Sequence, residues 1–191
     1  MRMNHHERPY VHFDADGEAD LKEIVMGLHW DPPEKGATAA TADLDALCIL
    51  LGAQHRLLDV IHPGRPRNAN ESVIHTGDSL TGASAWDDER IFVFLEALPE
   101  TVSTVVFVVA SATRRTVSEV RGASCHVSDR VTEHAWVRID LTKCEARRTH
   151  CVATLHRNGN GWRISTDEHA MPGELLAELP ALAANAKSGA R

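Results

Sequence analysis

The stretch 74–89, IHTGDSLTGASAWDDE, combines carboxylates, hydroxyls and glycines and has almost no apolar periodicity. Its carboxylates are Asp78, Asp87, Asp88 and Glu89. Calcium takes about six to eight oxygen ligands in irregular geometry, and Gly77 and Gly82 allow the backbone to turn carbonyl oxygens toward an ion. The stretch therefore favours a calcium site. A solvated polar surface loop is the alternative.

The stretch does not fit the calcium loop of helical-hand proteins. Asp78 and Glu89 stand at the first and twelfth positions of such a loop. However, Leu80 and Gly82 occupy positions where further Asp or Asn ligands are needed, and Ala83 replaces the required glycine. Any metal site here must take its missing oxygens from other parts of the chain.

A second acidic feature lies before the apolar run 46–51. Asp43 and Asp45 flank Leu44, so an extended chain places both carboxylates on the same side. Two like charges side by side repel, whereas a cation between them makes the arrangement favourable. The pair is a candidate to complete a site with the stretch 74–89, and a solvated strand entrance is the alternative.

Composition indicates one ordinary globular domain. The chain has 191 residues, with 43% hydrophobic and 25% charged residues, which argues against disorder of the whole chain. The net charge is -7, and the only adjacent basic pairs are 114–115 and 147–148. Nucleic acid is therefore not an expected partner, since a groove that follows phosphates needs clustered Lys and Arg.

The four cysteines show no CxxC spacing, which excludes the usual zinc-knuckle and redox-dithiol signals. They are expected to be free thiols: Cys48, Cys125, Cys144 and Cys151. The sequence contains neither a signal-peptide pattern at its start nor an apolar run long enough to span a membrane. We therefore expect a cytoplasmic protein.

Short strands separated by turns, with little helix, predict an antiparallel β-sandwich with a short C-terminal helical segment. The expected organisation is a flexible N-terminus at 1–9, a sandwich domain at 10–173 and a helical tail at 174–191. Residues 91–95 are expected to form a strand buried on both faces, central in the structure together with 102–110. The other expected strands are 24–30, 46–51, 57–61, 123–127, 136–141, 151–156 and 162–166.

Aromatic and histidine side chains near the acidic stretch have expected structural roles. Three of the four tryptophans lie in strand patterns and should pack in or beside the core. Trp86 lies within the polar stretch and is expected to pack over the end of the sandwich, with an exposed contact residue as the alternative. His75 is expected to support the loop by hydrogen bonding. The three core tryptophans are Trp30, Trp136 and Trp162.

In their order and spacing, several short motifs together resemble the TerD family of bacterial tellurium-resistance and stress-response proteins. The resemblance covers roughly 24–173 and implies a β-sandwich that binds calcium at one end through acidic loops. The motifs are GLHWD at 27–31, ADLDALCILL at 42–51, HTGDSLTG at 75–82, DDE at 87–89, VVFVV at 105–109, RIDLT at 138–142 and the NGNGW hairpin ending at Trp162.

Carried over onto this sequence, the resemblance implies one set of calcium-linked residues. Where the family usually has GDNLTGEGDGDDE, this chain has Ser79 for the Asn and Ala85 for an Asp. Fewer carboxylates weaken calcium binding, so one of the family's two metal positions is expected to be weakened or lost. The set is Asp31, Asp43, Asp45, Asp78, Asp87, Asp88 and Glu89, with backbone oxygens near Leu80 and Gly82.

Three functions follow for the chain. The first is a calcium-linked, non-enzymatic stress-response module that binds or assembles with protein partners of a stress-response complex. The second is a metal-free interaction module on the same scaffold. Ala83 and Ala85 favour it, because neither can supply a carboxylate to a metal. The third, a hydrolase using Cys and His, lacks a nucleophile elbow and any zinc-hydrolase spacing. An exposed edge strand would permit a homo-oligomer.

Overall fold

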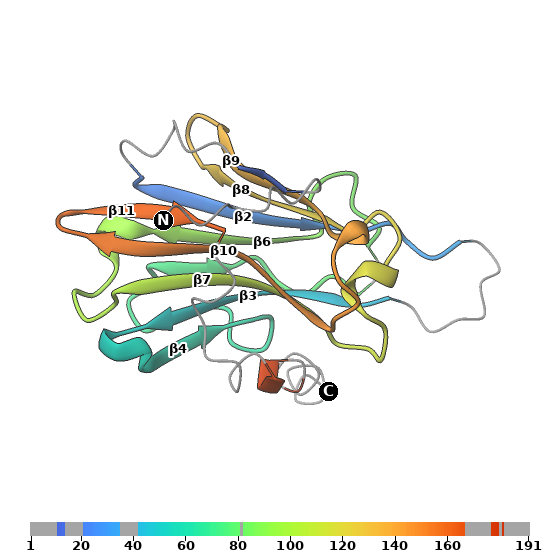
Figure 1. The fold of residues 1–191 in the computed structure, drawn as a ribbon, viewed down its shortest axis with the longest axis horizontal. Coiled ribbons are helices and arrows are strands. Elements are labelled where there is room, and N and C mark those ends of the chain that lie inside the picture. The colour runs from blue at the N-terminus through green and yellow to red at the C-terminus, as the bar shows by residue number, and fades with distance from the viewer. Residues whose placement is uncertain are drawn as a thin grey trace, which may run out of the picture.

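Two antiparallel sheets stack face to face in the computed structural model, which describes residues 11–13, 21–34, 42–80, 82–166, 177–179 and 181 (Figure 1). The first sheet has the strand order β1-β9-β8-β2-β6-β5. Its strands are β1 (Val11–Phe13), β2 (Glu23–His29), β5 (Val73–His75), β6 (Glu89–Phe94), β8 (Ser124–Asp129) and β9 (Ala135–Asp140).

The second sheet has the strand order β11-β10-β7-β3-β4. Among the described residues, four short 3-10 turns join strands, and η4 and η5 lie together at the right-hand end of the molecule in Figure 1. The strands of this sheet are β3 (Leu44–Leu51), β4 (Leu57–Ile61), β7 (Thr104–Ser111), β10 (Thr149–Asn158) and β11 (Gly161–Ser165). The turns are η2 (Ala53–His55), η3 (Leu95–Ala97), η4 (Val117–Glu119) and η5 (Leu141–Lys143).

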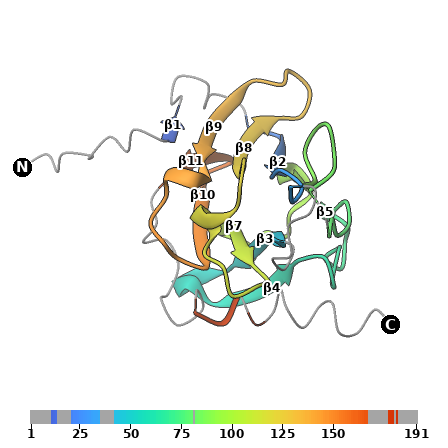
Figure 2. The same cartoon turned by 90° about the vertical axis from the view of Figure 1, so that its right-hand side faces the viewer.

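The main core fills the space between the sheets, seen end-on in Figure 2. Side chains alternate along β2, so Ile24, Met26 and Leu28 face the core and are fully buried. Phe107 of β7 is fully buried against the same core. This alternation confirms the β-sandwich expected from the sequence.

A smaller apolar cluster covers the outer face of the second sheet. Ile49 of β3 and Val108 of β7 are fully buried there and pack in one cluster with Leu179. Leu179 belongs to the short helical turn 177–179 beneath that sheet in Figure 1. Because the sheet is covered on both faces, every residue of β3 and β7 is buried, and their apolar residues do not alternate with exposed polar ones.

The strand positions agree with the sequence expectations, with two corrections. The expectation that residues 91–95 are buried on both faces was wrong, because β6 alternates buried and half-exposed residues and Phe92 and Phe94 face outward. β6 lies next to the edge strand β5, whereas β7 occupies the middle of its sheet as expected. Strands β1 and β5 were not predicted.

The expected terminal segments lie largely outside the described residues. This applies to all of 1–9 and to 174–191 except 177–179 and 181, which are helical. Among the described helical residues, no segment has the length and apolar character needed to cross a membrane.

Candidate functional site

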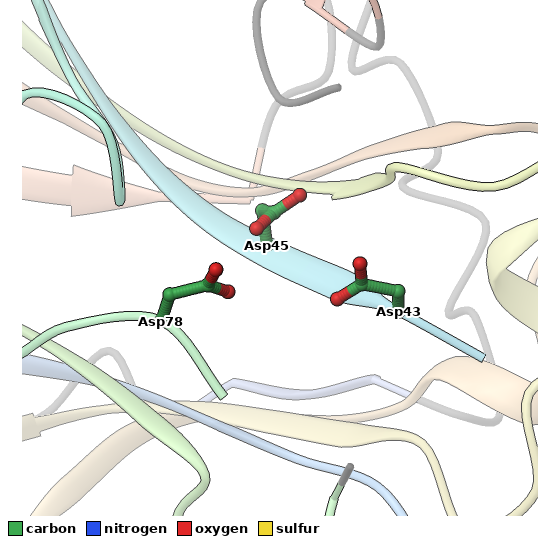
Figure 3. Close-up of side chains that lie close together, drawn as sticks. All are labelled: Asp43, Asp45 and Asp78. Carbon is green, nitrogen blue, oxygen red and sulfur yellow. The ribbon is translucent and has the colours of Figure 1, made fainter. Parts of the chain in front are cut away.

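Three carboxylates converge beside the first residues of β3. Asp43 directly precedes the strand, Asp45 is its second residue, and Asp78 lies in the loop that follows β5. One carboxylate oxygen from each lies within 4.8 Å of those of the other two. Figure 3 shows the side chains of Asp43, just before β3, and Asp45, on β3, with Asp78 lying opposite them. Residues far apart in the sequence thus form one acidic site.

The burial of these carboxylates is graded. Asp45 is fully buried, Asp43 is half-buried and Asp78 is exposed. Negative charges this close repel one another, and the repulsion is strongest where water is excluded. A hard cation bound between the carboxylates would offset it, with the exposed Asp78 side open to an entering ion. Within the described part of the chain, this is the only group of three possible metal-ligating side chains that close together.

Glu89 fixes the backbone beside two of these carboxylates. Its buried side chain accepts hydrogen bonds from the backbone N–H of Ala46 at 2.8 Å and of Ser79 at 3.2 Å. Ala46 follows Asp45, and Ser79 follows Asp78. Both carboxylate oxygens are therefore engaged by protein groups, and Glu89 acts by positioning β3 against the loop.

The imidazole of His75 completes this buried network. Its Nε2 lies 3.2 Å from Glu89 Oε2, and its Nδ1 accepts a hydrogen bond from the backbone N–H of Gly77. Burial raises the pKa of Glu89 above its ordinary value, although the hydrogen bonds from His75 and the two backbone N–H groups oppose that rise. The expectation that His75 supports the loop is confirmed.

Asp88 anchors the rest of the acidic loop. Its buried carboxylate accepts hydrogen bonds from the backbone N–H groups of Trp30 at 3.0 Å and Ser84 at 3.1 Å. His29 Nδ1 lies 3.0 Å from the same carboxylate. These contacts tie the loop to the end of β2. Asp88 is thus placed as a loop anchor rather than among the three converging carboxylates.

Asp87 points away from the acidic site, onto the outer face of the first sheet. It accepts a hydrogen bond from Arg90 Nε at 2.8 Å, and His126 Nε2 lies 3.2 Å from both of its oxygens. These groups lie over Gly27, where an added Cβ would stand 2.2 Å from His126 Nε2. The glycine is therefore required for this contact.

The remaining sequence candidates, Asp31, Leu80 and Gly82, are not among the three converging side chains. Asp31 pairs with Arg121 at 3.6 Å, and the Leu80 side chain is 56% exposed. Gly82 has a φ of 59° and packs against Trp30, whose indole an added Cβ would meet at 2.4 Å. The structure thus joins only Asp43, Asp45 and Asp78 of the nine predicted positions in one cluster of acidic side chains.

The tryptophans follow the sequence expectations with one exception. Trp30, Trp136 and Trp162 are buried as expected. The favoured packing of Trp86 was wrong, because its side chain is 76% exposed. Its backbone explains this placement, since the carbonyl oxygen lies 2.9 Å from His29 Nδ1 and the N–H donates to Ser84 Oγ. The loop is held while the indole projects outward.

All four cysteines are buried and none forms a disulfide, as expected. Burial raises the pKa of the Cys48 thiol, and the negative charge of Asp59 adds to that rise. Burial also raises the pKa of Cys125, with Cys144 contributing. Both thiols therefore stay protonated near neutral pH and are poor nucleophiles.

The Asp87 contact predicts a pH dependence of stability. Burial alone would raise the pKa of Asp87, but the hydrogen bond and charge of His126, followed by those of Arg90, lower it below its ordinary value. The unfolded chain then binds the proton more readily, so this contribution is complete above the unfolded pKa and is lost as pH falls through the folded pKa. We expect Asp87→Asn to cost roughly 1 kcal/mol at neutral pH.

Urea unfolding from about pH 6 to about pH 3, without calcium, measures this effect. The difference in unfolding free energy between the unchanged chain and Asp87→Asn should shrink as the pH falls. Glu100→Gln removes an exposed carboxylate and serves as the control. A difference that is constant over this range would contradict the assigned contact.

Comparison with known proteins gives consistent matches. A sequence model of the TerD domain matches residues 11–181. Tellurium resistance protein TerZ of Serratia marcescens is 30% identical over 166 residues, covering 83% of this chain and 86% of that protein. General stress protein 16U of Bacillus subtilis (strain 168) is 31% identical over 153 residues, covering 76% and 79%.

A solved structure matches the fold. It is the crystal structure of a homologue of telluride resistance protein (TerD) from Streptomyces coelicolor A3(2), with a TM-score of 0.67 and 21% identity. The match covers 76% of this chain and 88% of that one. At this identity the likeness concerns the fold alone.

Proposed function

This chain belongs to the TerD family, and from that premise we propose that it is a calcium-stabilised, non-enzymatic stress-response module. The observation that carries the proposal is the convergence of Asp43, Asp45 and Asp78 within 4.8 Å, with Asp45 fully buried. Three carboxylates drawn together from β3 and a distant loop favour a divalent cation bound between them.

Calcium suits this arrangement better than magnesium. Magnesium demands near-ideal octahedral geometry, whereas calcium accepts irregular sets of carboxylates, carbonyls and water. The loop beside Asp78 offers an irregular backbone, and the exposed carboxylate leaves room for water. Bound calcium would neutralise the carboxylates and hold the loop against β3, which makes one end of the sandwich rigid.

A rigid sandwich end suits a binding or assembly role. The named relatives are tellurium resistance and general stress proteins, which supports a place for this chain in a stress response. The proposed partners are other proteins of a stress-response complex. Four cysteines that form no disulfide suit a reducing compartment, so we propose that the module lies in the cytoplasm.

The alternative is a metal-free interaction module on the same scaffold. Ala85 favours it, because the family pattern has an Asp at that position and this chain offers one carboxylate fewer. The two proposals differ in one measurable property, the effect of calcium on stability.

Calcium titration of chelator-treated protein by calorimetry tests the proposal, together with the thermal midpoint with and without calcium. At about a hundred times its dissociation constant, calcium should add roughly 2.7 kcal/mol of stability if it binds only the folded chain. Asp78→Asn should remove both the heat and the shift, and Glu100→Gln, an exposed carboxylate elsewhere, should keep both. Absence of heat and shift at millimolar calcium would favour the metal-free module.

A further inference from the structure

A second candidate binding site lies on the outer face of the first sheet. A hollow of about 560 Å³ opens there, lined by β2, β6, β8, β9 and the loop that carries Trp86. Its volume falls within the range of about 300–1,000 Å³ that is typical of small-molecule sites. It shares no residue with the converging carboxylates Asp43, Asp45 and Asp78.

The strand register creates the basic wall of this hollow. Gly27 of β2 pairs with Arg90 on one side and with His126 on the other, and His126 pairs with Arg138. Directly paired residues point to the same face of a sheet, so Arg90, His126 and Arg138 form one row across four strands. The absent side chain at Gly27 leaves room in the middle of the row, where Asp87 and His126 meet.

Most charged groups in the lining already have partners. Asp87 contacts Arg90 and His126, and Arg130 pairs with Glu23. Asp129 accepts hydrogen bonds from the backbone N–H groups of residues 131 and 132.

Two charged lining groups remain. Arg138 makes no ion pair or side-chain hydrogen bond with any residue that the structure describes, and Glu133 supplies a carboxylate to the same lining. A guanidinium presents a planar fork of N–H donors that matches a carboxylate or a phosphate. Arg138 is therefore the group in this hollow best placed to bind an anion.

Two aromatic rings supply the apolar part of the hollow. Phe92 and Val25 form a second cross-strand pair, so they lie side by side on the same face as the basic row. Trp86 is 76% exposed, although its backbone is fixed by His29 and Ser84. A large indole held open to water beside a hollow is a ready surface for a flat apolar ligand.

We propose that this hollow binds a small aromatic anion, a planar ring that carries a carboxylate or a phosphate. The ring packs against Trp86 and Phe92, and the anionic group pairs with Arg138. The inference does not rest on calcium binding, since the two sites use different residues, and its test is carried out in chelator.

Benzoate and phenyl phosphate are the probes, titrated against the full chain by calorimetry and by tryptophan fluorescence. Trp86 is the only exposed one of the four tryptophans, so saturable quenching reports on this hollow. At least one probe should bind saturably, and benzyl alcohol and inorganic phosphate should bind at least about tenfold more weakly than that probe, because each lacks one of the two parts.

Variants localise the binding. Arg138→Gln should weaken the bound probe about tenfold or more, and Arg138→Lys, which keeps the charge but not the fork, should weaken it less. Glu133→Gln should tighten binding by removing a nearby negative charge. Arg56→Gln, in the turn before β4, removes an exposed arginine from the other sheet and should change nothing.

Several results would overturn the inference. These are the absence of saturable binding by both probes at millimolar concentration, equal binding of benzyl alcohol or inorganic phosphate, and unchanged affinity in Arg138→Gln with an unchanged thermal midpoint. Trp86→Ala provides the independent check by calorimetry, since it should weaken binding without altering the fold. Unaltered affinity in that variant would exclude the ring from the hollow.

Discussion

Asp45→Asn is expected to stabilise the calcium-free chain and to abolish its stabilisation by calcium. Asp45 is fully buried within 4.8 Å of two other carboxylates, so its charge is costly when no cation is bound. Asn has nearly the same shape and removes that charge. We expect a gain of about 1–2 kcal/mol without calcium and a loss of the roughly 2.7 kcal/mol that near-saturating calcium would add.

Asp45→Asn is expected to raise the unfolding free energy in chelator and to remove the increase that calcium gives. A substitution that simply damaged the fold would lower the unfolding free energy in both conditions. Urea unfolding in chelator and in excess calcium, on the unchanged chain and on Asp45→Asn, gives the four free energies needed. Glu100→Gln removes an exposed carboxylate and should change both conditions equally. If Asp45→Asn is less stable in chelator, protein groups rather than a cation hold that carboxylate, and the proposed calcium role fails.

The sequence predicted the sandwich because alternation and turn chemistry are local signals. The NGNG turn between residues 158 and 161 and the alternating apolar residues of β2 depend only on neighbours in the chain. The burial of β6 depends on more than its neighbours in the chain, because its run of apolar residues is the same whether the outer face of the strand is covered or open. Phe92 and Phe94 lie on the open outer face of β6. Only the packing of the two sheets determines which face of the strand is covered.

The acidic site was predicted only in part, for a similar reason. Strand alternation predicted that Asp43 and Asp45 lie on the same side, and the pair was a candidate to complete a site with the stretch 74–89, which contains Asp78. Asp87, Asp88 and Glu89 are adjacent in sequence, yet each meets different partners. Their contact partners, such as His126 for Asp87, lie far away in the sequence. No local sequence pattern predicts these contacts.

The exposure of Trp86 could not be predicted from neighbouring residues in the sequence either. A tryptophan in a polar loop is usually buried for its large apolar area. Here His29 and Ser84 hold the backbone instead, so the indole does not have to pack in order to fix the loop. Such anchoring depends on His29, which lies at the end of β2 and becomes a neighbour only in the folded chain.

Glu89→Ala is expected to cost about 3–5 kcal/mol of unfolding free energy, the largest loss among the substitutions considered. Its carboxylate is buried, and it accepts hydrogen bonds from Ala46 and Ser79 while contacting His75. Alanine would leave one buried and one partly buried backbone N–H group and a buried imidazole without their shared partner. Urea unfolding in chelator measures the loss without interference from calcium.

Glu89→Gln distinguishes positioning from simple stability. The carboxylate offers one oxygen to each of the two backbone N–H groups, whereas the amide of Gln has only one acceptor oxygen. One of the two hydrogen bonds is therefore lost, and the loop should shift relative to β3. We expect an intermediate loss of stability and weaker calcium binding, because Ala46 and Ser79 directly follow Asp45 and Asp78. Glu96→Gln, an exposed position, should alter neither. A Glu89→Gln chain with unchanged calcium affinity would show that the carboxylates find their positions without Glu89.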